Sequence, residues 1–432
     1  MKILLSAYAC EPNRGTEPGV GWNTAVALAQ HHPIWVFTSN THRAAIEAEL
    51  AIRPVENLQF VYLDPLGWVY DWSQEGKKAS WDVHLHYYLW QIFAYFVGRS
   101  LHQTVDFDLA HHITYGKYSA PSFLAFLPIP FFWGPVGGAE SAPKPFWKDF
   151  SLRARTYETF RGLSQWLGEA DPFVRLTAKR SRVAWYKAED TARRLRSLGA
   201  NCVTVLVESG LRQEEIDDLA NYPMPETAPI RFISMGRLLH WKGAYLGVRA
   251  FAKANLPDAE YWILGEGPER DRLQLMAEEL GVAKQIKFFG NLPRNEGLAK
   301  LGEAHVLVHP SLHDSGGWVC PEAMAVGRPI ICLDLGGPGV QVTTETGFKI
   351  PAHDPEQVVQ GLAEAMIRLA EDAELRKQMG SAGQNLVNQS YTWEAKAKTL
   401  VQTYEEAVAL GANRVDVKAK VEANFVGKGA SE

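Results

Sequence analysis

Short apolar runs alternate with amphipathic stretches along most of the chain. The runs have the length of strands and end at polar, glycine or proline positions. We therefore predict strands at residues 2–9, 33–39, 58–64, 109–114 and 130–134, and again at 230–236, 259–265, 286–290, 305–310 and 329–334. Strand–helix alternation of this kind predicts parallel sheets, and two sets of it predict two doubly wound α/β domains.

The boundary between the two domains is expected between about residues 208 and 228, where acids and prolines interrupt the alternation. We expect one domain over residues 1–207 and a second over 208–391. A C-terminal helix over 392–410 is expected to join the first domain, and residues 411–432, which have no periodicity, are expected to form a flexible tail. The total length of 432 residues also favours two domains.

The composition is that of a soluble globular enzyme, with 46% hydrophobic and 22% charged residues. A net charge of −5 argues against a general nucleic-acid binder. The apolar start of the chain is too short for a signal peptide or a membrane span. Four cysteines lack metal-ligand spacing, which predicts free buried thiols and a cytoplasmic protein: Cys10, Cys202, Cys320 and Cys332.

The stretch HDSGGWVCPEAMAVGRP combines two carboxylates with a pair of glycines after an apolar strand. Pro321 suits the first turn of a helix, so we predict a helix from Pro321 to Val326 that places Glu322 at its positive end. Gly316 and Gly317 would let a phosphate approach the backbone, with Asp314 and Glu322 accepting hydrogen bonds from sugar hydroxyls. The alternative is that Glu322 only caps its own helix and Asp314 only stabilises a turn.

The stretch SMGRLLHWKG places a second group of charges at the end of a strand. Arg237 follows the strand and Lys242 precedes the next helix, so the two cations straddle one loop. Ligands of open α/β sheets bind outside the carboxyl ends of the strands, where both stretches would lie. Arginine and lysine together form a clamp for phosphate oxygens, although a solvated surface pair is the simpler alternative.

Taken in order with LGEGPERDRL, FFGNLP, TGFKIPAHDPE and YTWEAKAKTLVQTYEEAV, these stretches resemble the C-terminal half of the retaining glycosyltransferase family 4. The resemblance is strongest over residues 230–408. It implies the GT-B fold, in which two Rossmann-like doubly wound domains face each other across a cleft. Residues 1–207 would then lie on the acceptor side, and residues 208–391 would bind a nucleotide sugar.

The resemblance also implies roles for the charged residues. Arg237 and Lys242 would grip the diphosphate and stabilise the leaving group, Glu322 would bind the ribose hydroxyls, and Asp314 would contact the transferred sugar. The family usually has Glu where this chain has Asp314, and the shorter side chain could change the choice of sugar or weaken the donor contact.

Other donor contacts follow from the same motifs. The loop that begins at Asp314 would contact the donor through Ser315, Gly316 and Gly317, largely through their backbone amides. Asn291 and Leu292, in FFGNLP, align with the segment that contacts the base.

Glycines of the first half resemble the loops that pack near the donor phosphates. GTEPGVGWN supplies Gly15, Gly19 and Gly21, and FFWGPVGGAES supplies Gly138. The first set fails as a dinucleotide-binding fingerprint because Thr24 stands where the third glycine is required. For Gly138 a simple turn is the alternative.

A pair of histidines in DFDLAHHITYG resembles the strand end that carries an active-site histidine in the family. Neighbours on a strand point to opposite faces, so only one of His111 and His112 can reach the site, and His112 is slightly favoured. A hydrogen-bonded core histidine is the alternative for each. Its expected role is contact with the sugar or the acceptor.

The expected activity is transfer of a hexose, with glucose as a guess, from a UDP-sugar to a saccharide or lipid-linked saccharide acceptor, with retention, in polysaccharide or glycoconjugate biosynthesis. We find no paired carboxylates of the kind that hold Mg²⁺ at a strand end, so metal-independent chemistry and no cofactor are expected. A sugar-nucleotide epimerase or phosphorylase on the same fold, and a non-catalytic sugar-nucleotide-binding scaffold, are the alternatives. The absent third glycine disfavours an NAD-dependent oxidoreductase.

Two further segments could contact an acceptor or a membrane surface. Aromatic residues gather at 68–100, where core packing, an acceptor surface and a membrane-resting helix are all open. Residues 151–200 have a surplus of basic residues, which suits either a solvated helix face or anionic lipid. Peripheral contact with the inner face of a membrane therefore stays open.

Overall fold

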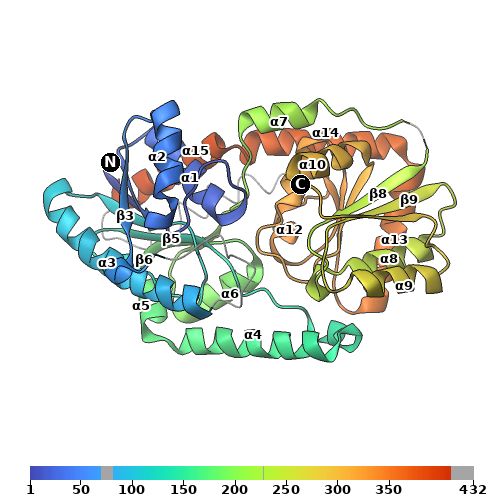
Figure 1. The fold of residues 1–432 in the computed structure, drawn as a ribbon, viewed down its shortest axis with the longest axis horizontal. Coiled ribbons are helices and arrows are strands. Elements are labelled where there is room, and N and C mark those ends of the chain that lie inside the picture. Colours follow the sequence, from blue (N-terminus) through green and yellow to red (C-terminus); the bar gives the residue numbers. More distant parts are fainter. Residues whose placement is uncertain (70–80, 227, 410–432) are drawn as a thin grey trace. The chain divides into compact units, whose positions relative to one another are not determined.

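The computed structural model describes residues 1–69, 81–226 and 228–409. The chain divides into two compact units, whose elements are labelled in Figure 1. The first unit comprises residues 1–139, 163–208 and the chain from Trp393 onward, and the second comprises residues 140–162 and 209–392. The expected tail at 411–432 lies outside the described residues.

The first unit is built on a seven-stranded sheet in the order β3-β2-β1-β4-β5-β6-β7, and every pairing in it is parallel. Its strands are β1 Ile3–Ser6, β2 Ile34–Ser39, β3 Leu58–Leu63, β4 Leu109–His112, β5 Phe131–Val136, β6 Ser181–Tyr186 and β7 Val203–Val205. The five strands predicted for the first half are confirmed. The sequence did not indicate β6, which follows a helix without turn residues, or the three-residue β7.

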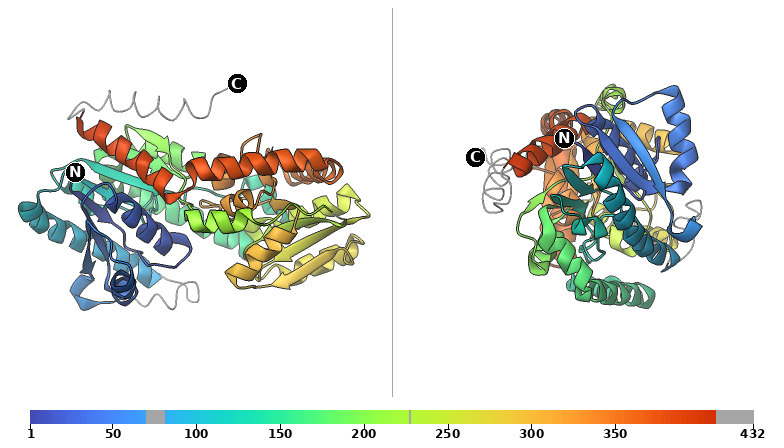
Figure 2. Two further views of the ribbon diagram at one scale, coloured as in Figure 1. Left: turned by 90° about the horizontal axis from the view of Figure 1, so that it is seen from above. Right: turned by 90° about the vertical axis from the view of Figure 1, so that its left-hand side faces the viewer.

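Helices cover this sheet, with α1 and α15 packed against each other (Figure 2). They are α1 Thr16–Ala29, α2 Arg43–Ile52, α3 Trp81–Val105, the second half of α4 Leu152–Ala170, α5 Pro172–Arg180, α6 Glu189–Leu198 and α15 Trp393–Ala409, with 3₁₀ turns η1 Asn40–His42, η2 Pro65–Gly67 and η4 Phe123–Phe126. Within the aromatic segment, Tyr87 and Trp90 of α3 are buried in the core, whereas Phe96 is exposed. Core packing is therefore the main role of its described part, and residues 70–80 lie outside the described residues.

The second unit has a six-stranded parallel sheet in the order β10-β9-β8-β11-β12-β13. Its strands are β8 Ile230–Met235, β9 Ala259–Leu264, β10 Ile286–Gly290, β11 Val306–His309, β12 Ile330–Leu333 and β13 Gly347–Ile350. The first five are the strands predicted for the second half, and β13 was not predicted. The strand order reverses between β8 and β11, so this pair is the topological switch point where ligands of such sheets bind.

Helices of the second unit lie between these strands and after them. They are η5 Lys144–Asp149, the first half of α4, α7 Gln213–Ala220, η6 His240–Lys242, α8 Ala244–Ala254, α9 Arg270–Glu279, α10 Arg294–Glu303, α11 Val319–Ala325, α12 Gly336–Gln341, α13 Pro355–Glu371 and α14 Ala373–Ser390. Helix α13 shows how the sequence sets a boundary. The Asp354 carboxylate accepts the amides of Glu356 and Gln357, and Pro355 occupies the first turn, where no amide is needed.

Residues 140–162 group with the second unit, although the sequence analysis assigned them to the first domain. Phe146 and Phe150 of this segment are buried in the same core as Leu238 and Tyr245. Their apolar side chains are removed from water by the second unit, which explains the grouping.

Two further predictions concern local features. The helix expected from Pro321 begins earlier, at Val319, so Pro321 is its third residue, although Glu322 remains in the first turn. The cysteines are free and buried, as predicted. Within the described residues, no helix combines the length and apolarity needed to cross a bilayer.

Candidate functional site

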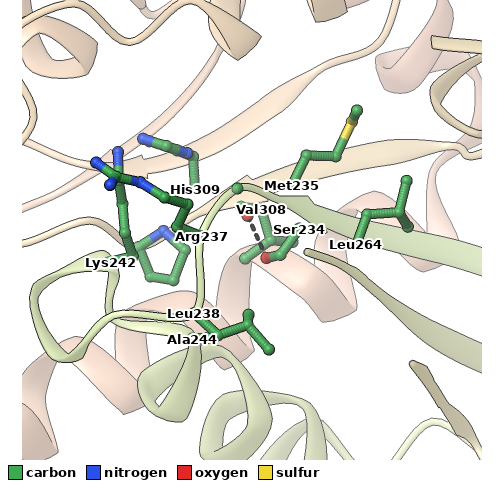
Figure 3. A pocket seen from close by; sticks show the side chains of 11 residues that line it. Ser234, Met235, Arg237, Leu238, Lys242, Ala244, Leu264, Val308 and His309 are labelled. Carbon is green, nitrogen blue, oxygen red and sulfur yellow. Dashed lines mark hydrogen bonds between the residues drawn. The ribbon is translucent and has the colours of Figure 1, made fainter. Parts of the chain in front are cut away.

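A pocket lies at the carboxyl ends of β8 and β11 in the second unit, at the topological switch point (Figure 3). Its lining includes Gly236, Arg237 and Lys242 from the loop after β8, and His309 and Pro310 from the end of β11. Figure 3 shows the Arg237, Lys242 and His309 side chains gathered on one side of the pocket. The two cations predicted to form a clamp are therefore brought together.

The backbone of the loop after β8 requires glycine at its end. Gly243 has φ of +68°, and a Cβ there would lie 1.9 Å from the carbonyl oxygen of Pro310. The loop therefore lies directly against the end of β11, a contact that only glycine permits. This contact places Lys242, the residue before Gly243, beside the acidic loop that follows β11.

Lys242 is already engaged by Asp314. The lysine Nζ lies 2.5 Å from Asp314 Oδ2, which also accepts a hydrogen bond from His309 Nε2 at 3.1 Å. Burial alone would raise the pKa of Asp314, but the Lys242 charge and the His309 hydrogen bond outweigh it and hold this pKa well below its usual range. Asp314 is therefore an ionised carboxylate that fixes the lysine ammonium in place.

Arg237 differs from Lys242 in having no partner. Arg237 is exposed, and among the described residues no side chain forms a hydrogen bond or ion pair with its guanidinium. The Lys242–Asp314 pair is neutral overall, so Arg237 leaves the pocket with a net positive charge. A pocket of this kind favours an anion with two or more oxygens.

A larger cavity of about 680 Å³ shares the wall formed by Met235, Gly236, Arg237 and Leu264 with this pocket. Its far side is lined by Asn291 and Leu292 after β10, by Arg294 and by Glu322 of α11. The volume falls within the range of small-molecule sites. The structure thus brings the predicted base-contacting segment and the predicted ribose-binding glutamate to one cavity next to the cationic pocket.

Glu322 is held by Arg294, which no motif of the sequence indicated. Arg294 Nη2 donates to Glu322 Oε1 at 2.8 Å, and its Nη1 donates to Glu215 Oε1 at 3.0 Å. Burial raises the pKa of Glu322, and the Arg294 charge opposes this rise without cancelling it. Arg294 therefore orients the glutamate and favours its ionised form, in which the carboxylate only accepts hydrogen bonds.

The loop between Asp314 and α11 is braced at each residue. Ser315 Oγ donates to Glu140 Oε2 at 2.5 Å, Gln341 Nε2 donates to the carbonyl oxygen of Gly316 at 2.6 Å, and the Gly317 amide donates to Asp314 Oδ1 at 3.3 Å. The predicted donor contacts of Ser315 and Gly317 are thus occupied by protein groups in this structure.

A buried glutamate ties together the two loops that carry the charged residues. Glu158 Oε1, on α4, accepts from His240 Nε2 at 2.9 Å and from His313 Nε2 at 3.2 Å. His240 lies two positions before Lys242, and His313 lies directly before Asp314. Burial alone would raise the pKa of Glu158, but the two histidines outweigh it and lower this pKa to about 2.

The glycines predicted near the phosphates in the first half have mainly packing roles. Gly15 is the N-cap of α1, and Gly19 and Gly21 lie inside that helix and are buried rather than in a loop. A Cβ on Gly19 would lie 2.1 Å from the carbonyl oxygen of Arg14, and one on Gly21 would lie 2.4 Å from that of Ala9. Both glycines permit the backbone of the preceding loop to approach the helix.

Gly138 lies just after β5 with φ of +94°, where a side chain would be strained. Its carbonyl oxygen accepts a hydrogen bond from Gln165 Nε2 at 2.7 Å. This geometry supports the turn that the sequence left open as an alternative.

His111 is buried on the face of the first sheet that α15 covers. Its Nδ1 lies 2.6 Å from the Tyr404 hydroxyl, and its Nε2 lies 2.7 Å from the carbonyl oxygen of Gly134. Burial lowers the pKa of His111 to about 3. These contacts are those of a neutral core histidine.

His112 points to the opposite face, as expected of neighbours on a strand, and is also buried. Its Nε2 lies 3.0 Å from the Tyr87 hydroxyl, and its Nδ1 lies 3.1 Å from Ser122 Oγ. Burial lowers the pKa of His112 to about 4. The structure therefore favours the core interpretation for both histidines and brings neither of them to an open pocket.

In residues 1–69, 81–226 and 228–409, no group of three or more His, Cys, Asp or Glu side chains is placed to hold a metal ion.

Two Rossmann-like units with these strand orders define the GT-B fold. The same fold occurs in sucrose-phosphate synthase from Thermosynechococcus elongatus, with a TM-score of 0.60 and 18% identity over 95% of this chain and 100% of that chain. It also occurs in Anabaena Alr3699/HepE, solved in complex with UDP, with a TM-score of 0.58 and 16% identity over 94% of this chain and 100% of that chain. At these identities the likeness concerns the fold alone.

A match to a known protein family lies in the second unit. Residues 219–386 match the family model for glycosyl transferases group 1, so this part of the chain carries the family domain that its motifs predicted. D-inositol 3-phosphate glycosyltransferase from Corynebacterium glutamicum (strain R) is 32% identical over 184 residues, which are 40% of this chain and 43% of that protein. The chain spans about half the length of the curated relatives it matches.

Proposed function

We propose that the protein is a retaining glycosyltransferase that moves a hexose from a UDP-sugar, in the first instance UDP-glucose, to a saccharide or lipid-linked saccharide acceptor. The observation that carries this proposal is the cationic pocket at the switch point, which shares a wall with a cavity lined by a carboxylate. We assign the diphosphate of the donor to the first and its nucleoside to the second. Retention is proposed from the family match, and the choice of UDP is supported by the nucleotide bound to Alr3699/HepE.

The donor would lie across the shared wall of the two cavities. Arg237 and Lys242 would bind the diphosphate, and Glu322, held by Arg294, would accept hydrogen bonds from the ribose hydroxyls. Asn291, with its neighbour Leu292, would border the base. This arrangement assigns the larger cavity to the nucleoside and leaves the sugar near the acidic loop.

Breaking the bond between the sugar and the diphosphate develops negative charge on the leaving phosphate, and preorganised cations stabilise that charge. The Asp314 carboxylate fixes Lys242 before the donor arrives, so little rearrangement is needed. Among the described residues, Asp314 Oδ1 accepts a hydrogen bond only from the Gly317 amide, at 3.3 Å, and would keep a lone pair for a hydroxyl of the transferred sugar. Asp314 therefore would serve both the cation and the sugar, despite being shorter than the glutamate usual in the family.

Calorimetric titration of the protein with UDP tests the site. Arg237→Ala and Lys242→Ala should each weaken binding by about tenfold or more, because each removes a charge-assisted hydrogen bond to phosphate. Lys377→Ala, which removes a charge from an exposed position on α14, is the matched control and should leave affinity unchanged. Unchanged affinity in both site variants would reject the proposed diphosphate site.

Product analysis with UDP-glucose tests the activity. Release of UDP that depends on an added saccharide supports a transferase. Turnover that needs inorganic phosphate would instead indicate a phosphorylase, and conversion of the sugar without transfer would indicate an epimerase. Tight UDP binding with no turnover of any nucleotide sugar would indicate a non-catalytic binding protein.

A further inference from the structure

Helix α4 is amphipathic with its apolar side facing outward. Its buried positions at a helical spacing are mainly polar, at Glu158 and Gln165, together with Ala154. Each polar group has a partner within its own unit, since Glu158 binds two histidines and Gln165 Nε2 donates to the carbonyl oxygen of Gly138. A surface helix ordinarily buries its apolar stripe and exposes its polar one, so α4 is reversed.

The exposed side of α4 carries large apolar side chains in a helical repeat. They are Leu152, 81% exposed, Phe160, 71%, Leu163, 49%, Trp166, 62%, and Leu167, 57%. Phe160 follows Leu152 by eight residues, Leu163 follows Phe160 by three, and Trp166 and Leu167 follow Leu163 by three and four, so all five return to one side of the helix. Figure 1 shows α4 as one uninterrupted helix, so these side chains form a continuous stripe along it. A contiguous exposed apolar stripe marks a surface that meets an apolar environment.

Charges around this stripe have one sign. Both carboxylates of α4 are occupied, Glu158 by the histidines and Glu169 by the Tyr118 hydroxyl at 2.7 Å. The exposed charges of the helix are basic, at Arg153 and Arg155. Within this helix, which the structure describes in full, the surface offered to a partner is therefore apolar and cationic.

Helix α5, separated from α4 only by Asp171, continues the same composition. Phe173 and Leu176 are exposed, and so is Arg175. Arg175 Nε donates to the carbonyl oxygen of Glu169 at 3.0 Å, which places this cation beside the last turn of α4. The apolar and basic character thus extends past the end of α4.

We propose that the outward side of α4, extended by α5, is a docking surface for an anionic lipid bilayer, with the apolar stripe inserted at the interface and the arginines on the headgroups. Leu, Phe and Trp side chains flanked by Lys or Arg are the composition of interfacial amphipathic helices. Anionic headgroups complement the one-signed charge, whereas a second copy of the same surface would repel it. This inference does not depend on the proposed transferase activity, because it uses none of the pocket residues.

Co-sedimentation of the full chain with vesicles tests the proposal. Protein should pellet with mixed phosphatidylcholine–phosphatidylglycerol vesicles at low salt, and much less with pure phosphatidylcholine or at high salt. A triple variant, Phe160→Ser with Trp166→Ser and Leu167→Ser, should lower the bound fraction at least tenfold. Arg153→Glu should lower it for anionic vesicles alone. The matched control, Ile52→Ser with Leu275→Ser, removes two apolar side chains that are 75% and 59% exposed elsewhere, and it should bind like wild type.

Three results would overturn the proposal. The first is wild-type protein that stays in the supernatant with anionic vesicles at low salt. The second is binding by the triple variant and by Arg153→Glu that equals wild type while their unfolding temperatures are unchanged. The third is a wild-type dimer that the triple variant dissociates, since the stripe would then join two copies of the chain.

Discussion

Glu158→Gln gives the sharpest test of how the charged loops of the second unit are held. The change keeps the side chain's size but removes the charge that accepts hydrogen bonds from His240 and His313. The pKa of Glu158 falls from 4.5 to about 2 in the folded protein. A pKa difference of one corresponds to about 1.4 kcal/mol, so the ionised carboxylate stabilises the folded state by about 3 kcal/mol at neutral pH. The side chain is 1% exposed, so solvent screens its charge only weakly.

The pH dependence has a defined sign. A folded-state pKa below the unfolded-state pKa gives stability that is complete above pH 4.5 and is lost as the pH falls toward 2. The difference between wild type and Glu158→Gln should therefore be about 3 kcal/mol at pH 7 and less than half as large at pH 3.

Thermal unfolding at several pH values measures this difference. At pH 7 the transition of the variant should lie about 6–12 °C below that of wild type. Glu278→Gln, which neutralises an exposed glutamate on α9, is the control and should leave the transition in place. An unchanged transition for Glu158→Gln, or a difference that stays constant down to pH 3, would refute the reasoning.

Two further predictions concern the loops around the cavities. Arg294→Met should weaken UDP binding about tenfold, and more at pH 6 than at pH 8, because the pKa of Glu322 is already raised and would rise further without the arginine. The control Arg212→Met, which removes another cation beside Glu215, should leave UDP affinity unchanged. A loss of affinity in Arg294→Met that is independent of pH would contradict the role assigned to Arg294. Gly243→Ala should lower the free energy of unfolding in chemical denaturation more than Gly281→Ala does. Both glycines have positive φ, but only a Cβ on residue 243 would collide with a backbone carbonyl, whereas residue 281 has open space and its variant should lose about 1–2 kcal/mol. Equal losses would show that the backbone at Pro310 can move away from the added Cβ.

Hydrophobic patterning identified most of the strands, including β3 and β10 at the sheet edges, but it missed β6, β7 and β13. The ten predicted strands are all present, because a buried strand of a parallel sheet is apolar on both faces and stands out as a short run. β7 and β13 are edge strands, which need less apolar character, and β13 includes the half-buried Lys349. β6, next to the edge strand β7, begins with Ser181 and Arg182 and so lacks an apolar start.

Glycine patterns were harder to interpret than strand patterns. Gly19 and Gly21 have the spacing of a phosphate-binding loop, yet they lie inside α1, where each permits close approach of a backbone carbonyl. Both uses require a residue without a side chain, so the sequence alone does not separate them. Only the position of the first helical residue, Thr16, distinguishes a loop from a helix here.

The charged pocket could be predicted because topology places it. In a sheet of this order, residues after β8 and β11 must meet at the switch point, so Arg237, Lys242 and Asp314 converge without knowledge of side-chain packing. No such rule places Glu158, whose partners lie 82 and 155 residues away along the chain.

The same distinction explains why the second unit includes a segment from the first half of the sequence. Residues 140–162 bring Glu140 to Ser315 and Glu158 to the two histidines. Removing either carboxylate from water is favourable only when it is hydrogen-bonded, and the partners of both lie in the second unit. The polar contacts and the buried Phe146 therefore act together, and we expect the loops that carry Lys242 and Asp314 to lose their geometry when this segment is detached.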